Sequence, residues 1–215
     1  MSAAPKARVG KPRFERQLPE QRRGALIAAT IECLKRYGHE GLSIRTISAQ
    51  AGVSVGLINH HFPNKDELVA AAYRQFNAEL VAGLQTAVER AERTPRARLR
   101  AFLEASFSEP NLDQDVLAVW VVFWGMYRHS RLIQRVHSEN YHGYVQLLHG
   151  MLADLLKPER RHEGSVDVRL AAIGLTALLD GLWLEWCLEP ATFRPEEGVR
   201  LCEDWIEHLC RRTDR

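Results

Sequence analysis

The sequence lacks the patterns of several protein classes. It has only four cysteines, Cys33, Cys187, Cys202 and Cys210, which are widely scattered and form no Cys-x-x-Cys pair. Zinc fingers and redox motifs need closely spaced cysteines, so we expect reduced and mostly buried thiols instead. The nine histidines form no His-Glu-x-x-His pattern, and no Walker or dinucleotide glycine motif is present. We therefore expect no metal, no cofactor and no enzymatic activity.

Features of membrane and secreted proteins are also missing. No apolar run approaches the roughly 20 residues that cross a bilayer. Residues 1–10 are basic but have no apolar core of the kind found in a signal peptide. We expect a cytoplasmic protein that makes no contact with a membrane.

Alternation of apolar and polar residues, the pattern of a β-strand, is nowhere sustained. The periodicity is helical instead, and glycine, proline and capping residues divide it into segments. The sequence thus predicts an all-α fold. The expected helices cover residues 20–37, 43–51, 54–61, 64–94, 95–107, 113–128, 131–156, 166–188 and 195–211.

Positive charge is concentrated in the first third of the chain. Residues 1–65 contain 11 Lys or Arg and 4 Asp or Glu, whereas residues 66–215 contain 18 and 23. A basic small unit beside an acidic larger one is typical of a nucleic-acid-binding domain attached to a different module. Seven of the 11 basic residues precede Gly24, so a solvated arm would give the same count.

Residues 43–62 have the order helix, short turn, helix, which is the arrangement of a DNA-binding helix-turn-helix. Gly52 suits the turn because it has no side chain to clash there, and Val53 can fill the corner. In the second helix Ile58 and Phe62 share the inward face. The outward face is then Val55, Gly56, Asn59 and His60, with Leu57 and His61 at its border.

An outward face of this composition suits the major groove. Asn59 can pair with an adenine edge, and Val55 or Leu57 can touch a thymine methyl group. Gly56 lets the helix backbone approach the DNA. Ser43 and Ser54 begin their helices, where hydroxyl and amide groups also suit phosphates.

Residues 41–68, G-L-S-I-R-T-I-S-A-Q-A-G-V-S-V-G-L-I-N-H-H-F-P-N-K-D-E-L, resemble the DNA-binding segment of the TetR family of repressors. The match covers about residues 20–75. It implies that Arg45 contacts bases, that Asn59 and His60 contact the groove and phosphates, and that Lys65 contacts a phosphate; His61 is usual in the family. Many members have Tyr where this chain has Asn59, so the operator sequence cannot be transferred. The candidate DNA-contacting residues are Ser43, Arg45, Ser54, Val55, Gly56, Leu57, Asn59, His60, His61 and Lys65.

This resemblance implies a division of the chain into three parts. We expect a flexible basic arm at residues 1–18 and a three-helix DNA-binding domain at residues 19–66. A long helix then leads into a helical bundle for ligand binding and dimerisation at residues 67–215. The implied function is a repressor that binds a palindromic operator as a homodimer and is released by a small-molecule effector. Two recognition helices one DNA turn apart, or a multiple of it, would account for the need to dimerise.

The larger part of the chain has two clusters of aromatic residues. Trp120, Trp124 and Tyr127 recur at helical spacing in one segment, and Asp180, Trp183, Glu185 and Trp186 gather in another. Aromatic rings with a carboxylate bind quaternary ammonium ions, whereas large aromatics at helical spacing are also common in cores. The segments 119–124 and 179–184 resemble those of choline-sensing betaine-pathway repressors of the same family. The candidate ligand-binding residues are Trp120, Trp124, Tyr127, Asp180, Trp183 and Glu185.

The last two helices have small or apolar faces that suit a two-fold four-helix interface, or packing within one chain. These faces comprise Ala171, Gly174, Leu178 and Leu182 on one helix and Cys202, Trp205, Ile206 and Leu209 on the other.

Other interpretations remain open. A TetR-type regulator of an efflux or of a lipid or aromatic catabolic operon is one, and a helical small-molecule-binding or scaffold protein that does not read DNA is another. Residues 52–56 also spell G-x-S-x-G, the serine motif of α/β-hydrolases. That motif needs a preceding strand, which this all-helical pattern does not provide.

Overall fold

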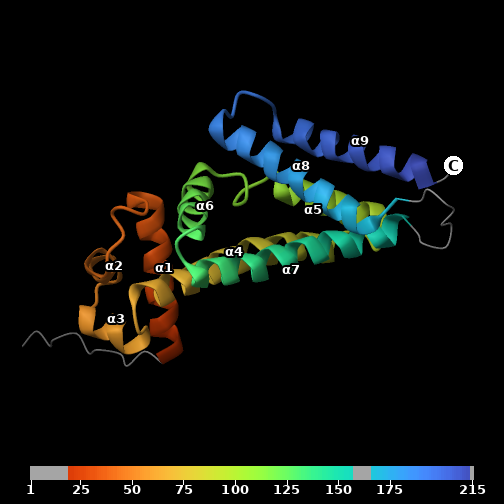
Figure 1. The fold of residues 1–215 in the computed structure, drawn as a ribbon. Helices are drawn as coiled ribbons and strands as arrows, with labels where there is room; N and C mark the ends of the chain where they lie inside the picture. The colour runs from red at the N-terminus through yellow and green to blue at the C-terminus, as the bar shows by residue number, and fades with distance from the viewer. Residues whose placement is uncertain (1–18, 157–165, 214–215) are drawn as a thin grey trace, which may run out of the picture.

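The computed structural model describes residues 19–156 and 166–213, and the predicted arm at residues 1–18 lies outside this part (Figure 1). The described residues form nine helices and no strand, which confirms the all-α prediction. The helices are α1 (Pro19–Tyr37), α2 (Ile44–Ala51), α3 (Val55–His61), α4 (Lys65–Arg90), α5 (Pro95–Ser106), α6 (Gln114–Tyr127), α7 (Arg131–Leu156), α8 (Val168–Leu188) and α9 (Pro195–Thr213).

Short polar residues begin most of these helices. Asn64, Thr94 and Asp113 each accept a hydrogen bond from a backbone N–H in the first turn of the following helix. Such caps satisfy N–H groups that have no partner within the helix. Because caps and breakers are local features, the helix bounds lie close to those predicted from the sequence.

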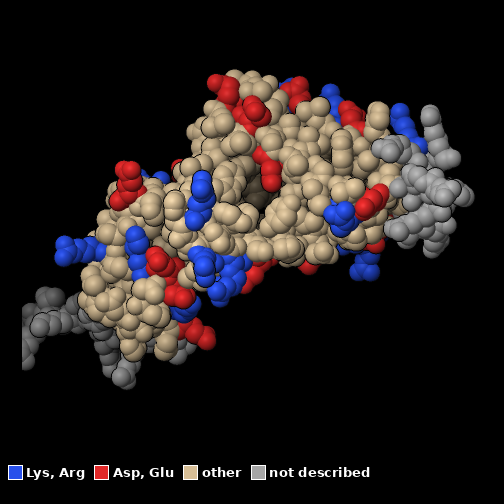
Figure 2. All heavy atoms as spheres, viewed as in Figure 1, with Lys and Arg blue, Asp and Glu red and all other residues tan. Residues whose placement is uncertain are grey.

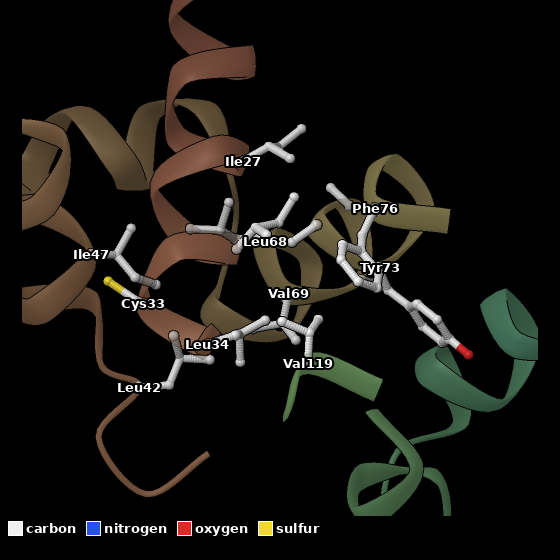
Figure 3. Close-up of a cluster of buried hydrophobic side chains, with 14 of the residues drawn as sticks. Ile27, Cys33, Leu34, Leu42, Ile47, Leu68, Val69, Tyr73, Phe76 and Val119 are labelled. Carbon is white, nitrogen blue, oxygen red and sulfur yellow. The ribbon is translucent and has the colours of Figure 1, made fainter. Parts of the chain in front are cut away.

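A first hydrophobic core joins α1, α2 and α3 to the rest of the molecule (Figure 3). Ile47 and Ile58 are fully buried in it against α1 and the start of α4. Val119 of α6 and Val136 of α7 belong to the same cluster, and α1 packs directly on α6. The guanidinium of Arg23 lies 4.4 Å from the centre of the Phe62 ring. This core therefore extends without a break from the helix-turn-helix into the larger part of the molecule.

A second core fills the remaining bundle. Helices α4 and α7 lie side by side along the molecule, with α5, α8 and α9 packed over their far half (Figure 1). Phe102, Leu148, Leu175 and Cys202 are fully buried in this cluster. None of the four cysteines forms a disulfide within the described residues, and three of them are buried, as predicted.

The faces predicted for dimerisation are largely used within the chain. Ala171, Cys202 and Ile206 are buried in the second core. A Cβ atom on Gly174 would lie only 3.0 Å from the Trp205 ring, so α8 and α9 are in close contact there. These residues pack within the chain, whereas Leu178, Leu182 and Leu209 are only partly buried, so a role of these faces in dimerisation stays a prediction.

A neighbouring face of α8 is apolar and uncovered. Leu170, Ile173 and Leu188 are 55%, 38% and 66% exposed, and Leu201 of α9 is 50% exposed. Helix α8 is the one described helix that is long and apolar enough to cross a membrane, with a hydropathy of 1.4, which the search for apolar runs did not anticipate. Its opposite face is packed into the bundle through Ala172 and Leu175, so it serves as a core helix of this fold.

Candidate functional site

The turn between α2 and α3 has the geometry that the sequence predicts. Ser43 caps α2 in a capping box: its hydroxyl accepts from the Thr46 N–H at 3.1 Å, and its own N–H donates to the Thr46 hydroxyl at 2.8 Å. Gly52 ends α2 with φ of 64°, a left-handed conformation that side chains disfavour. Ser54 caps α3 by accepting from the Leu57 N–H. Ser43 and Ser54 thereby fix where each helix begins.

Helix α3 presents one polar face to solvent. Val55, Gly56, Asn59 and His60 are exposed, while Ile58 is fully buried. Leu57 and His61 are partly buried, in agreement with their predicted border positions. The seven-residue helix thus exposes a short strip of the size that fits a major groove.

Two predicted contact residues lie beside this strip. Arg45 is exposed on α2. Lys65, at the first position of α4, is partly buried, and its ammonium donates to the Leu42 carbonyl at 3.4 Å. Lys65 therefore also ties the start of α4 to the loop before α2, a role that the sequence did not indicate.

A cavity of about 170 Å³ lies among α4, α6, α7 and α8. Figure 2 shows an opening on this face, in the region where Figure 1 places α6, α7 and α8. Four of the six predicted ligand residues line the cavity: Trp120, Trp124, Asp180 and Trp183. An apolar cavity of roughly 150 Å³ admits benzene, so the space suits a small ligand.

The three tryptophans form one side of the cavity. The ring centres of Trp120 and Trp124 are 6.0 Å apart, and those of Trp124 and Trp183 are 6.4 Å apart at 86°. The Trp183 indole donates to the Asn111 carbonyl at 2.8 Å, which fixes its orientation. Trp124 is 42% exposed, so it is not a core residue in the single chain. The three rings therefore contact one another and also line the cavity.

Asp180 supplies the negative charge of the cavity lining. Desolvation raises its pKa to about 6, and none of the ion pairs among the described residues includes it. Tyr144 lines the cavity next to it, and burial, with a smaller contribution from the Asp180 charge, raises the pKa of Tyr144. A carboxylate that lacks a positive partner in an aromatic cavity favours a cationic ligand.

Tyr127 and Glu185 do not line the cavity. Tyr127 is the last residue of α6 and packs against the His137 ring at 5.2 Å. Glu185 is exposed on α8 and follows Trp183 by two positions, which places it on a different face of the helix. The structure thus assigns these two predicted ligand residues to other surroundings.

The comparisons with known proteins now settle the family. Residues 26–72 match the family described as "Bacterial regulatory proteins, tetR family", and residues 95–211 match "BetI-type transcriptional repressor, C-terminal". A curated relative from Burkholderia thailandensis, "HTH-type transcriptional regulator BetI", is 32% identical over 88% of this chain and 94% of its own length. The chain belongs to the TetR family of transcriptional regulators, with a BetI-type C-terminal region.

Solved structures share the fold of this TetR-family regulator. A transcriptional regulator from Pseudomonas aeruginosa PAO1 is 49% identical, with a TM-score of 0.82 over 93% of this chain and 95% of that one. A regulator from Saccharomonospora viridis, solved in complex with choline, is 21% identical, with a TM-score of 0.73 over 88% of this chain and 97% of that one. At that identity the second match shows a common fold.

Helix α7 of the regulator contributes a wall that sequence reasoning missed. His137, Asn140, Tyr141 and Tyr144 line the cavity from one helix face. Their spacing of three and four residues was visible in the sequence, and their mixture of polar and aromatic types is unusual for a core face. That mixture was the available signal, but which helices meet this face depends on the tertiary structure.

The G-x-S-x-G motif of the regulator is a structural turn. Ser54 follows helix α2 rather than a strand, and its hydroxyl accepts a hydrogen bond as the cap of α3. This geometry explains the motif without nucleophilic chemistry.

Proposed function

We propose that this TetR-family regulator is a homodimeric repressor that binds a palindromic operator and releases it when a small quaternary ammonium compound, such as choline, occupies the cavity. The observation that carries the proposal is that Trp120 contacts both the cavity and the core of the helix-turn-helix. This side chain lines the cavity and also packs on Tyr73 and Phe76, with ring centres 5.6 and 5.8 Å away. Both partners belong to the core that contains the helix-turn-helix.

The DNA-reading surface in this proposal is the exposed strip of α3. Val55, Asn59 and His60 would reach base edges or phosphates, and Arg45 would contact DNA from the neighbouring helix. The backbone N–H groups at the capped starts of α2 and α3 suit phosphates. A regulator acting in this way works in the cytoplasm, where the bacterial chromosome lies.

The exposed apolar face of α8 supports dimerisation. Leu170, Ile173, Ala177, Leu184 and Leu188 are spaced by three, four or seven residues, so they lie on one side of the helix, where Leu184 is partly exposed and the others are exposed. Exposed apolar surface of this kind is typical of an interface, and the same stripe on a second copy is self-complementary about a two-fold axis. Leu201 of α9 extends the surface.

The effector class follows from the chemistry of the cavity. Tryptophan faces attract cations through their quadrupoles, and Asp180 balances the charge of a cation that cannot donate hydrogen bonds. The Saccharomonospora regulator with the same fold was solved with choline. A cavity of about 170 Å³ is too small for a long acyl chain, which speaks against a lipid effector.

Coupling between the two sites would use α4, which begins beside the recognition helix and lines the cavity through Tyr73, Asn77 and Leu84. A hundredfold loss of operator affinity requires the effector to prefer the released conformation by about 2.7 kcal/mol. A few cation–π and charge contacts are enough to supply that difference.

Fluorescence anisotropy with DNA from upstream of the regulator's own gene tests the proposal. We expect salt-sensitive, sequence-selective binding that choline weakens. The Lys65→Ala variant should bind all sequences more weakly, while Asn59→Ala should change the preference among operator variants. Because Lys65 also contacts the Leu42 carbonyl, thermal melting of that variant must show an intact fold. Sequence selectivity that is unchanged in both variants would exclude α3 as the reader.

A further inference from the structure

The cavity contains one buried polar group that no protein atom satisfies. The side-chain nitrogen Nδ2 of Asn140 is inaccessible to solvent and has no hydrogen-bond partner among the described residues. Buried amide groups are rarely left without a partner, because the loss of water is then not compensated. An unsatisfied donor in a cavity wall therefore indicates where a ligand atom is bound.

Three other polar groups of the lining already have hydrogen-bond partners. The Asn111 side chain donates to the Ala105 carbonyl at 3.1 Å, and the Thr176 hydroxyl donates to the Ala172 carbonyl at 2.9 Å. His137 pairs through Nδ1 with the Tyr73 hydroxyl at 2.9 Å. Since these groups have partners within the protein and the buried amide nitrogen of Asn140 has none among the described residues, Asn140 is well placed to recognise a polar atom of the effector.

Asn140 lines the same cavity as the negative charge of Asp180. It precedes Tyr144 by one turn on the cavity face of α7, which corresponds to a rise of about 6 Å. Asp180 lies close enough to Tyr144 to affect its ionisation. A small cation beside Asp180 can therefore extend a short chain along α7 to the Asn140 amide.

We infer that Asn140 is a specificity-determining residue that hydrogen-bonds a hydroxyl group on the effector, so the cavity takes quaternary ammonium alcohols. This inference rests on the proposed cationic effector. The hydroxyl oxygen accepts a hydrogen bond from the amide nitrogen. With the amide group rotated by half a turn, the hydroxyl would instead donate to the amide oxygen. A carboxylate at the same end would add a second negative charge to a cavity that already contains Asp180, so ammonium carboxylates are disfavoured by like-charge repulsion.

Calorimetric titration of the full-length protein with choline, n-propyltrimethylammonium and glycine betaine tests the inference. The second compound replaces the choline hydroxyl by a methyl group, so its cationic end is unchanged. The wild-type protein should bind choline about tenfold more tightly than n-propyltrimethylammonium, which corresponds to about 1.4 kcal/mol. Glycine betaine should bind more weakly than choline.

The Asn140→Leu variant should bind both choline and n-propyltrimethylammonium with similar affinity, because its apolar side chain cannot distinguish them. Gln146→Leu, on the exposed face of the same helix, is the matched control and should keep the tenfold preference. Equal affinities in the wild-type protein, or a preference that persists in Asn140→Leu, would overturn the role of Asn140 while leaving the cationic effector intact. Failure of both cations to bind the wild-type protein would overturn the cationic effector and this inference together.

Discussion

The Tyr73 hydroxyl and the His137 Nδ1 atom lie 2.9 Å apart, and this hydrogen bond joins α4 to α7 at the cavity wall. The Tyr73 ring is buried in the core shared with the helix-turn-helix (Figure 3). It stacks on the Phe123 ring, with ring centres 4.1 Å apart. Burial lowers the pKa of His137, so its imidazole is neutral at physiological pH. Tyr73 of α4 thus belongs both to the cavity lining and to the core that contains the helix-turn-helix.

Removing this hydrogen bond should weaken communication between the sites. The Tyr73→Phe variant keeps the ring and its stacking, so we expect a loss of about 1 kcal/mol in unfolding free energy. Its choline-induced change in operator affinity should be smaller than that of the wild-type protein. Urea unfolding and anisotropy titrations measure the two effects, with Tyr37→Phe, an exposed tyrosine of α1, as the control. A Tyr73→Phe protein with unaltered stability and choline response would show that the hydroxyl has no such role.

The affinity for a cationic effector should depend on pH through Asp180. Desolvation raises the pKa of this carboxyl to about 6 in the free protein, and a cation binds the ionised form more tightly. The affinity is therefore fully present only well above pH 6, and it falls as the pH decreases through 6 and the carboxyl is protonated. By linkage, the dissociation constant of choline should rise about tenfold between pH 7.5 and pH 5.

The Asp180→Asn variant separates this effect from other protonations. It should bind choline more weakly at neutral pH, and its affinity should vary much less with pH. His137 is another lining residue with a shifted pKa, which burial lowers, and it remains in this variant. Calorimetry across the same pH range provides the measurement. A pH dependence that is equally steep in Asp180→Asn would point to His137 instead.

Placing a charge on the apolar stripe of α8 should separate the dimer. In Ile173→Glu a carboxylate would be buried opposite its two-fold copy, so we expect monomers in light scattering after gel filtration and at least a tenfold loss of operator affinity. Val121→Glu places the same charge on α6, where Val121 is 53% exposed, and should leave the dimer intact. If Ile173→Glu stays dimeric, another surface forms the interface.

Replacing two exposed glycines by alanine should change the unfolding free energy in opposite directions. Gly52 has φ of 64°, so Gly52→Ala should lose about 1 kcal/mol of unfolding free energy. Gly83 lies within α4, and a Cβ atom there meets nothing within 4 Å. Gly83→Ala should therefore gain about 0.5–1 kcal/mol. Urea unfolding of both variants checks the pair, and a stabilised Gly52→Ala would contradict the strain assigned to the turn.

The sequence predicted the helices and the recognition strip because the relevant signals are local. Ser43, Gly52 and Ser54 act on the backbone within one turn, and the inward position of Ile58 follows from helical periodicity. The cavity depends on contacts between distant segments. Trp120 and Trp183 were identified by residue type, but nothing in the sequence shows that α7 meets them with Asn140.

The difference between local signals and long-range contacts also explains why two predicted ligand residues do not line the cavity. Glu185 is near Trp183 in the sequence but points from a different side of α8, and Tyr127 lies beyond the cavity at the end of α6. Small residues of the predicted dimer face can pack against α9 or against a second chain, and in the structure Gly174 lies in close contact with Trp205 of α9. Whether such residues pack against their own chain or against a second chain depends on the arrangement of the whole bundle, which the sequence does not show.

Linkage between cavity and operator is tested most directly by the choline affinity of the regulator with and without bound operator DNA. Thermodynamic reciprocity requires that DNA lower the choline affinity by the same factor by which choline lowers the DNA affinity. We predict two equal factors, each greater than ten. Equal choline affinities for the free and DNA-bound protein would contradict control of DNA binding through this cavity.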